Sequence, residues 1–140
     1  MAQPRRETSS PAETEAVAAE LAGRLQPGDV VLVSGELGSG KTTFVRGACR
    51  ALGVTSVVTS PTYTVGQVYA RGDHGEIAHL DLYRLDSLAG EDPALLDDYL
   101  TPERIGFVEW PEAGEPGIER VAARVRIEHA GGDRRVLEIT

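Results

Sequence analysis

The chain has 140 residues, of which 41% are hydrophobic and 26% charged, a composition typical of one globular domain and unlike that of a disordered chain. Its net charge of −8 argues against direct binding of RNA or DNA, because an acidic surface repels phosphate backbones. The sequence has no apolar run of the ~20 residues that a membrane span needs, no secretion signal and only one cysteine. We therefore expect a cytoplasmic protein without membrane contact or internal disulfide.

The first expected element is an amphipathic helix that follows a loose leader over residues 1–9. Ser10 opens a capping box and Pro11 takes the first helical position, and both features are typical of a helix start. Apolar residues then recur at every fourth position up to Leu25, so we expect the helix to continue until Pro27-Gly28 ends it.

Strands and helices alternate in the rest of the chain. A continuous apolar run at 29–34 predicts a strand buried on both faces, and a one-sided apolar stripe predicts a helix at 41–52. The later patterns predict strands at 65–70, 77–83 and 105–110, a short helix at 94–99, and a terminal hairpin at 121–129 and 135–139. This order predicts a single α/β domain over residues 1–140, with a mixed parallel and antiparallel central sheet.

The only lysine of the chain lies in GELGSGKT, residues 35–42, which fits the phosphate-binding pattern G-x-x-x-x-G-K-[ST]. Glycines let backbone N–H groups turn towards a phosphate, and the following helix adds its positive N-terminal end. Lys41 has a compact charge on a flexible stem that reaches the β- and γ-phosphates, and Thr42 is suited to ligate Mg²⁺. With this motif we expect the three-layer sandwich of the P-loop NTPases. ATP is the expected nucleotide, because the chain has no asparagine and no second lysine for the Asn-Lys-x-Asp loop that reads guanine.

Two acidic residues near strand ends are candidates for the Mg²⁺ shell that such a site needs. Glu109 ends an apolar strand, and Asp81 lies in an alternating one; simple exposure to water is the alternative for both. Thr62 lies where switch loops sense a γ-phosphate, although an ordinary turn explains the same residues. Trp110, next to Glu109, is either a packing residue or one close to the nucleotide.

The segments GELGSGKTTF, SPTYT, HLDLYRL and VEWPE, in this order and spacing, closely resemble the TsaE (YjeE) family of small bacterial P-loop ATPases. That family acts in the biosynthesis of threonylcarbamoyladenosine in tRNA. The resemblance runs from the first helix to the final hairpin. This chain departs from the family pattern at Ser39, which takes a place often filled by alanine.

The resemblance also implies a role for each matching residue. The nucleotide phosphates would be held by Gly38, Ser39, Gly40, Lys41, Thr42 and Thr43. Mg²⁺ would be ligated by Thr42 and Glu109, while Asp81 would lie close to the γ-phosphate and the attacking water. Thr62 would belong to the switch segment, and Trp110 would lie near the site or at a partner surface. Adenine would bind between the start of the first helix and the terminal hairpin turn, near Ser10, Pro11, Gly132 and Asp133.

By the same resemblance, the chain would be a nucleotide switch on the TsaB and TsaD proteins, with tRNA reached only through that complex. No motif places an arginine finger, so we expect ATP hydrolysis to be slow alone and faster with the partners. A small-molecule kinase is one alternative, but the short acidic stretch 91–104 argues against an arginine-bearing lid. A non-catalytic nucleotide-binding adaptor is another, and the presence of Lys41, Thr42, Asp81 and Glu109 argues against it.

Overall fold

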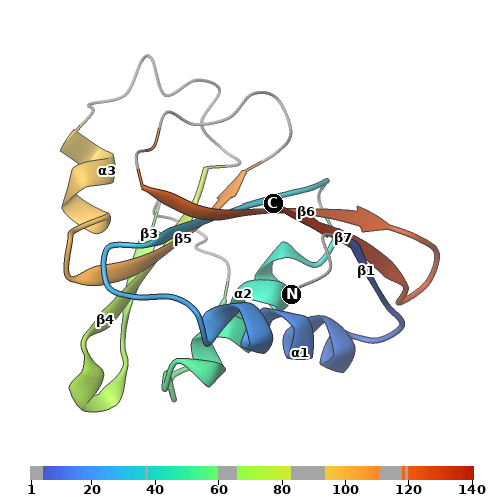
Figure 1. Cartoon of the computed structure of the whole chain (residues 1–140), viewed down its shortest axis with the longest axis horizontal. Coiled ribbons are helices and arrows are strands. Elements are labelled where there is room, and N and C mark those ends of the chain that lie inside the picture. The colour runs from blue at the N-terminus through green and yellow to red at the C-terminus, as the bar shows by residue number, and fades with distance from the viewer. Residues whose placement is uncertain (1–4, 37, 60–65, 83–93, 111–117, 119) are drawn as a thin grey trace.

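A mixed sheet forms the centre of the fold in the computed structural model, which describes residues 5–36, 38–59, 66–82, 94–110, 118 and 120–140 (Figure 1). Its strands are β1 (Arg5–Thr8), β2 (Val30–Ser34), β3 (Gly66–Ala70), β4 (Glu76–Asp81), β5 (Arg104–Trp110), β6 (Val121–His129) and β7 (Arg135–Ile139). They lie in the order β1-β7-β6-β2-β5-β4-β3. β2 pairs in parallel with β5 and β6, and β4 with β5, whereas the outer pairs are antiparallel. The predicted mixed sheet is therefore confirmed.

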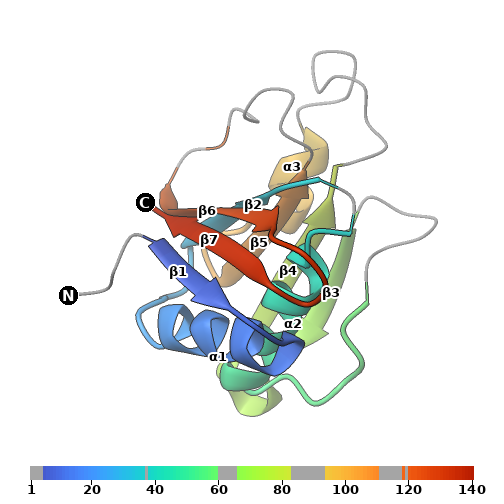
Figure 2. The same ribbon diagram turned by 90° about the vertical axis from the view of Figure 1, so that its right-hand side faces the viewer.

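Helices cover both faces of this sheet, as the three-layer prediction requires. α1 (Pro11–Ala22) and α2 (Lys41–Ala51) lie side by side on one face, and α3 (Ala94–Tyr99) lies on the other (Figures 1 and 2). A short 3₁₀ turn, η1 (Gly72–His74), joins β3 to β4. Of the helices in the described ranges, none has both the length and the apolar character to cross a membrane.

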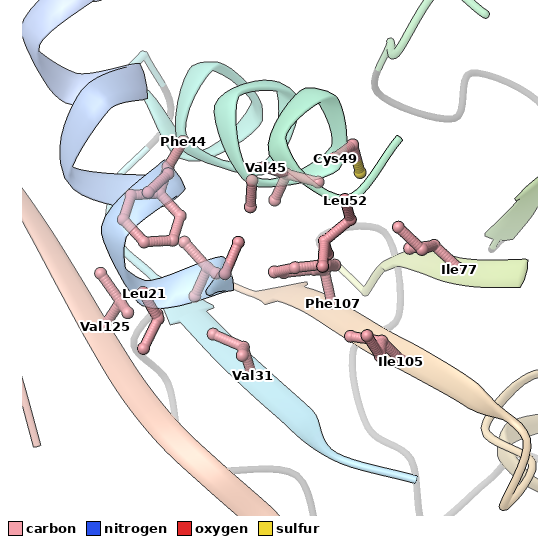
Figure 3. Packing of buried hydrophobic residues seen from close by; sticks show 14 of the residues in the cluster. Leu21, Val31, Phe44, Val45, Cys49, Leu52, Ile77, Ile105, Phe107 and Val125 are labelled. Carbon is pink, nitrogen blue, oxygen red and sulfur yellow. The ribbon is translucent and has the colours of Figure 1, made fainter. Parts of the chain in front are cut away.

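β2 explains how two apolar layers form on one sheet. All five of its residues are buried, and their side chains alternate between the faces. Val31 and Val33 join the cluster beneath α1 and α2, whereas Val30 and Leu32 join the cluster on the α3 side. Figure 3 shows the larger cluster, to which α1, α2 and four strands contribute Leu21, Phe44, Val45, Cys49, Val31, Ile77, Ile105, Phe107 and Val125.

The prediction of a loose leader over residues 1–9 is wrong for Arg5–Thr8, which form β1 and pair antiparallel with β7. The Arg6 guanidinium lies 3.0 Å from the Glu20 carboxylate of α1, and the buried hydroxyls of Thr8 and Thr14 are 2.7 Å apart. Four mostly polar residues have no strand pattern of their own. Their backbone hydrogen bonds with the edge of β7 order them instead.

The start of α1 matches the expected cap, but its end does not. Ser10 Oγ accepts a hydrogen bond from the Glu13 N–H at 3.2 Å, while the Glu13 carboxylate accepts one from Ser9 N–H at 2.9 Å. The helix ends at Ala22, with Gly23 as its C-cap, and does not continue to Pro27-Gly28. The apolar spacing was misleading here, because Leu25 packs against the core from outside the helix.

Candidate functional site

Several of the predicted site residues, among them Lys41, Thr42 and Glu109, lie at one edge of the sheet. β2, β4 and β5 run parallel, so their carboxyl ends meet at the same edge, the usual place for ligands in such sheets. The chain leaves β2 through residues 35–40, which we call the glycine loop, and enters α2 at Lys41. In the parallel register, Glu109 lies beside Val33 on one side and beside Asp81 on the other.

Two glycines are required by the shape of the glycine loop. Gly35 has φ = 152°, and a Cβ there would lie only 2.5 Å from the Ile127 carbonyl oxygen. Gly40 has φ = 104° at the position that caps α2, a left-handed conformation that glycine adopts without strain. The loop thus turns sharply at both of its ends, and α2 begins with its N-terminal N–H groups directed towards the loop.

Lys41 is buried, and its ammonium group lies within the glycine loop. Nζ donates hydrogen bonds to the carbonyl oxygens of Gly35 at 2.5 Å and Glu36 at 3.2 Å. The Ser39 hydroxyl of the same loop is buried and has no hydrogen-bond partner among the described residues, which is unusual for a polar atom in a protein interior. A positive charge and an unsatisfied hydroxyl in one loop fit an anionic oxygen ligand.

Thr42 and Glu109, the two residues predicted to ligate Mg²⁺, contact each other. Thr42 Oγ1 donates to the two carboxylate oxygens of Glu109 at 3.1 and 3.3 Å, although the residues are 67 positions apart in the chain. Within the described ranges, no cluster of three or more His, Cys, Asp or Glu residues is suited to hold a metal ion. Mg²⁺ fits such a sparse donor set, because it commonly takes one or two protein oxygens and completes its octahedron with phosphate oxygens and water.

Glu109 has a second partner that the sequence analysis did not identify. Its carboxylate accepts a hydrogen bond from His79 Nε2, and both side chains are almost completely buried. On the other side of the ring, His79 Nδ1 lies 3.1 Å from the Tyr69 hydroxyl. Burial, and then the neighbouring Cys49 thiol, raise the pKa of Tyr69 to about 12, so the phenol keeps its proton at neutral pH.

The turn between β6 and β7 lies against the glycine loop, and Arg135 joins the two. Its guanidinium donates to the carbonyl oxygens of Ser39 at 2.8 Å and Gly38 at 3.3 Å. It also donates to Gly132 at 2.7 Å and Arg134 at 2.8 Å within the turn. Sequence reasoning gave Arg135 no role, because no motif links it to residues almost one hundred positions away.

The other predicted residues fall into three groups. The start of α1 comes near the same turn, since Thr8 pairs with Arg135 in the register of β1 and β7, and Ser10 and Pro11 follow two residues later. Thr43, in the first turn of α2, and Asp81, the last residue of β4, are partly buried. Thr62 lies outside the described residues, as does the side chain of Trp110, whose backbone closes β5.

Comparison with known proteins points to one family. The family model described as "Threonylcarbamoyl adenosine biosynthesis protein TsaE" matches residues 8–137. The tRNA threonylcarbamoyladenosine biosynthesis protein TsaE of Bacillus subtilis is 37% identical over 133 residues, which cover 95% of this chain and 82% of that protein. The protein of the same name from Streptomyces coelicolor is 40% identical over 114 residues, which cover 81% of this chain and 77% of that protein. The crystal structure of Bacillus YdiB superposes with a TM-score of 0.72 at 30% identity, covering 96% of this chain and 82% of that one.

Proposed function

This chain belongs to the TsaE family and serves tRNA threonylcarbamoyladenosine biosynthesis, and from that premise we propose that it binds and hydrolyses Mg²⁺·ATP at the glycine loop. The observation that carries the proposal is the bond from Thr42 to Glu109, made where the loop opens into α2 beside the buried ammonium of Lys41. A hydroxyl, a carboxylate and a lysine in this arrangement suit a magnesium-bound triphosphate.

Each residue has a distinct part in the proposed reaction. The Lys41 ammonium would leave the carbonyl oxygens of Gly35 and Glu36 and bind phosphate oxygens instead, and it would neutralise the negative charge of the phosphates. Thr42 Oγ1 and the Glu109 carboxylate would hold Mg²⁺, which when bound offsets the charge of the β- and γ-phosphates. Asp81 would orient the attacking water, because the sheet register places it beside Glu109.

Neither Arg135 nor Arg46, two arginines that the described part of the chain places beside the glycine loop and on α2, is free to supply a catalytic charge. The guanidinium of Arg135 lies beside the loop, but it is already bonded to four carbonyl oxygens. Arg46, on α2, is directed to the Val58 carbonyl at 3.4 Å. We therefore propose that hydrolysis is slow in the isolated protein and faster in a complex with the TsaB and TsaD proteins. In that complex the chain acts as a nucleotide switch and, being acidic, reaches tRNA only through its partners.

Calorimetry and a reconstituted modification reaction test this proposal. We expect heat of Mg²⁺·ATP binding with the wild type and none with Lys41→Ala. Arg50→Ala removes a positive charge near the other end of the same helix and should bind ATP like the wild type. With TsaB, TsaD and tRNA, the wild type should support many rounds of modification and Lys41→Ala a single round.

Three results would contradict the proposal. Equal ATP binding by the wild type and Lys41→Ala would refute the assignment of the phosphate site. Release of ADP only in the presence of a metabolite hydroxyl would identify a kinase. Full complementation of the modification pathway by Glu109→Ala would identify an adaptor that does not depend on hydrolysis.

A further inference from the structure

A buried chain of polar groups runs from the proposed metal site into the sheet. It begins at the Glu109 carboxylate on β5, passes through His79 on β4 and ends at Tyr69 on β3. His79 is 0% exposed, Glu109 1% and Tyr69 5%. Polar side chains placed this deeply are costly unless they satisfy one another, so each link of the chain constrains the next.

The hydrogen-bonding capacity of each group fixes the direction of the first link. An ionised carboxylate only accepts hydrogen bonds, so His79 Nε2 must carry the proton that it shares with Glu109. In this tautomer the opposite nitrogen, Nδ1, accepts the hydrogen bond of the Tyr69 hydroxyl at 3.1 Å, and the single proton of that hydroxyl is then not available to the Thr59 carbonyl oxygen, which lies 3.3 Å away. The histidine ring is thereby held from both sides.

The same carboxylate also accepts hydrogen bonds from Thr42, a residue in the first turn of α2. Thr42 Oγ1 lies within 3.3 Å of both carboxylate oxygens, whereas His79 bonds only to Oε2. The histidine therefore prevents the carboxylate from rotating without occupying the face directed to Thr42. A histidine that fixes a metal-binding carboxylate in this way commonly sets metal affinity, by 10- to 100-fold when it is lost.

We propose that His79 is a positioning residue that aims Glu109 at the magnesium ion, with Tyr69 holding the histidine ring. The inference rests on the proposed function, because it concerns Mg²⁺ bound with ATP.

The test separates magnesium-dependent from magnesium-independent binding of ATP. The variants are His79→Leu, which removes the donor; His79→Gln, which retains an N–H group; and Tyr69→Phe, which removes only the phenol oxygen. Tyr99→Phe is the matched control, since Tyr99 is a partly buried tyrosine packed against the cluster on the α3 side. ATP affinity is measured by calorimetry with excess Mg²⁺ and with EDTA, and circular dichroism establishes that each variant is folded.

We expect His79→Leu to lose about tenfold or more in affinity with Mg²⁺ and less than about twofold with EDTA. His79→Gln should recover most of the lost ATP affinity. Tyr69→Phe should lose about threefold in ATP affinity, and only in the presence of Mg²⁺. Tyr99→Phe should match the wild type. If His79→Leu does not fold, Tyr69→Phe and His79→Gln decide the question. A side-chain ¹⁵N NMR spectrum gives a readout that does not depend on turnover. The chain has three histidines, and the signal that disappears in His79→Gln belongs to His79. That signal should show the Nε2–H tautomer in the wild type and should shift when Mg²⁺·ADP is added.

The outcomes distinguish the inference from the proposed function. Equal losses with Mg²⁺ and with EDTA would mean that His79 only supports the fold, and unchanged magnesium dependence in folded His79 and Tyr69 variants would overturn the inference directly. If the wild type itself bound no ATP, or bound it equally with and without Mg²⁺, the proposed function would fail instead.

Discussion

Removing the Arg135 guanidinium should separate the turn between β6 and β7 from the glycine loop. Arg135→Ala deletes two hydrogen bonds to the loop carbonyls, at 2.8 and 3.3 Å, together with two that brace the turn. Each such bond contributes about 0.5–1.5 kcal/mol net, and the low end applies because Arg135 is only partly buried. Loss of the two loop bonds therefore costs about 1–2 kcal/mol, or about 5- to 30-fold in ATP affinity if the turn must be held in place to bind adenosine.

Calorimetry with two ligands makes this prediction specific. Under the proposed function, Mg²⁺·ATP would engage both the glycine loop and the residues that hold the adenosine, whereas Mg²⁺·tripolyphosphate would engage the phosphate site alone. We expect Arg135→Ala to weaken ATP binding by the stated factor and tripolyphosphate binding by less than about threefold. Arg134→Ala is the control, because the bond that its guanidinium makes to the described residues, with the Ala130 carbonyl, stays within the turn.

Three results would contradict the reasoning about Arg135. Unchanged ATP affinity would show that the turn makes no contribution to the nucleotide site. Equal weakening of ATP and tripolyphosphate would show that Arg135 acts on the phosphates or the loop, and the expected adenine contacts at Gly132 and Asp133 would lose their support. A lowered melting temperature with both affinities retained would assign Arg135 to stability alone.

Two further predictions concern the packing on which the site depends. Gly47→Ala should lower the melting temperature by about 3–10 °C, equivalent to about 1–3 kcal/mol, because the new Cβ would lie 2.5 Å from backbone atoms of Glu15 on α1. Gly23→Ala is the control: Gly23 has φ = −62° and its Cβ would have no atom closer than 3.5 Å, so the melting temperature should be unchanged or slightly raised. Equal effects of the two substitutions would contradict this steric argument. Burial raises the pKa of the Cys49 thiol from 9.0 to about 12. Above pH 9 the unfolded thiol therefore loses its proton while the folded one retains it, so the free energy of unfolding in urea should fall with pH. Cys49→Ala should reduce that slope, and an unchanged slope would contradict the assignment.

Much of the fold was predictable because its signals are local. The bounds of α3, β6 and β7 agree with the sequence patterns, and β2 and α2 agree to within a residue. β1 was missed because its order depends on pairing with β7 at the other end of the chain. The end of α1 was missed for a different reason: Gly23 is an ordinary helix terminator, but the continuing apolar period outweighed it in the sequence analysis.

The site was predictable only where a motif spans it. The contact of Thr42 with Glu109 follows from two known patterns, each of which has a fixed place relative to a strand end. Tyr69 and Arg135 belong to no such pattern, and the segment HLDLYRL contains His79 without giving that residue a partner. The partners of His79 and Arg135 are 30 and 96 positions away, at Glu109 and Ser39, and only the strand order brings them together.

The proposed metal ligand also helps to specify the sheet that holds it. The apolar run of β5 is hydrophobic on both faces, so apolar burial alone does not determine which residue lies beside Asp81. The side chain of Glu109 determines the register instead. In the observed register it meets His79 and Thr42 on the α2 side, whereas a slip by one residue would turn it towards the apolar cluster that contains Leu32 and Val108. A carboxylate buried there without a donor costs several kcal/mol, so the register that assembles the candidate site is also the one that the buried acid selects.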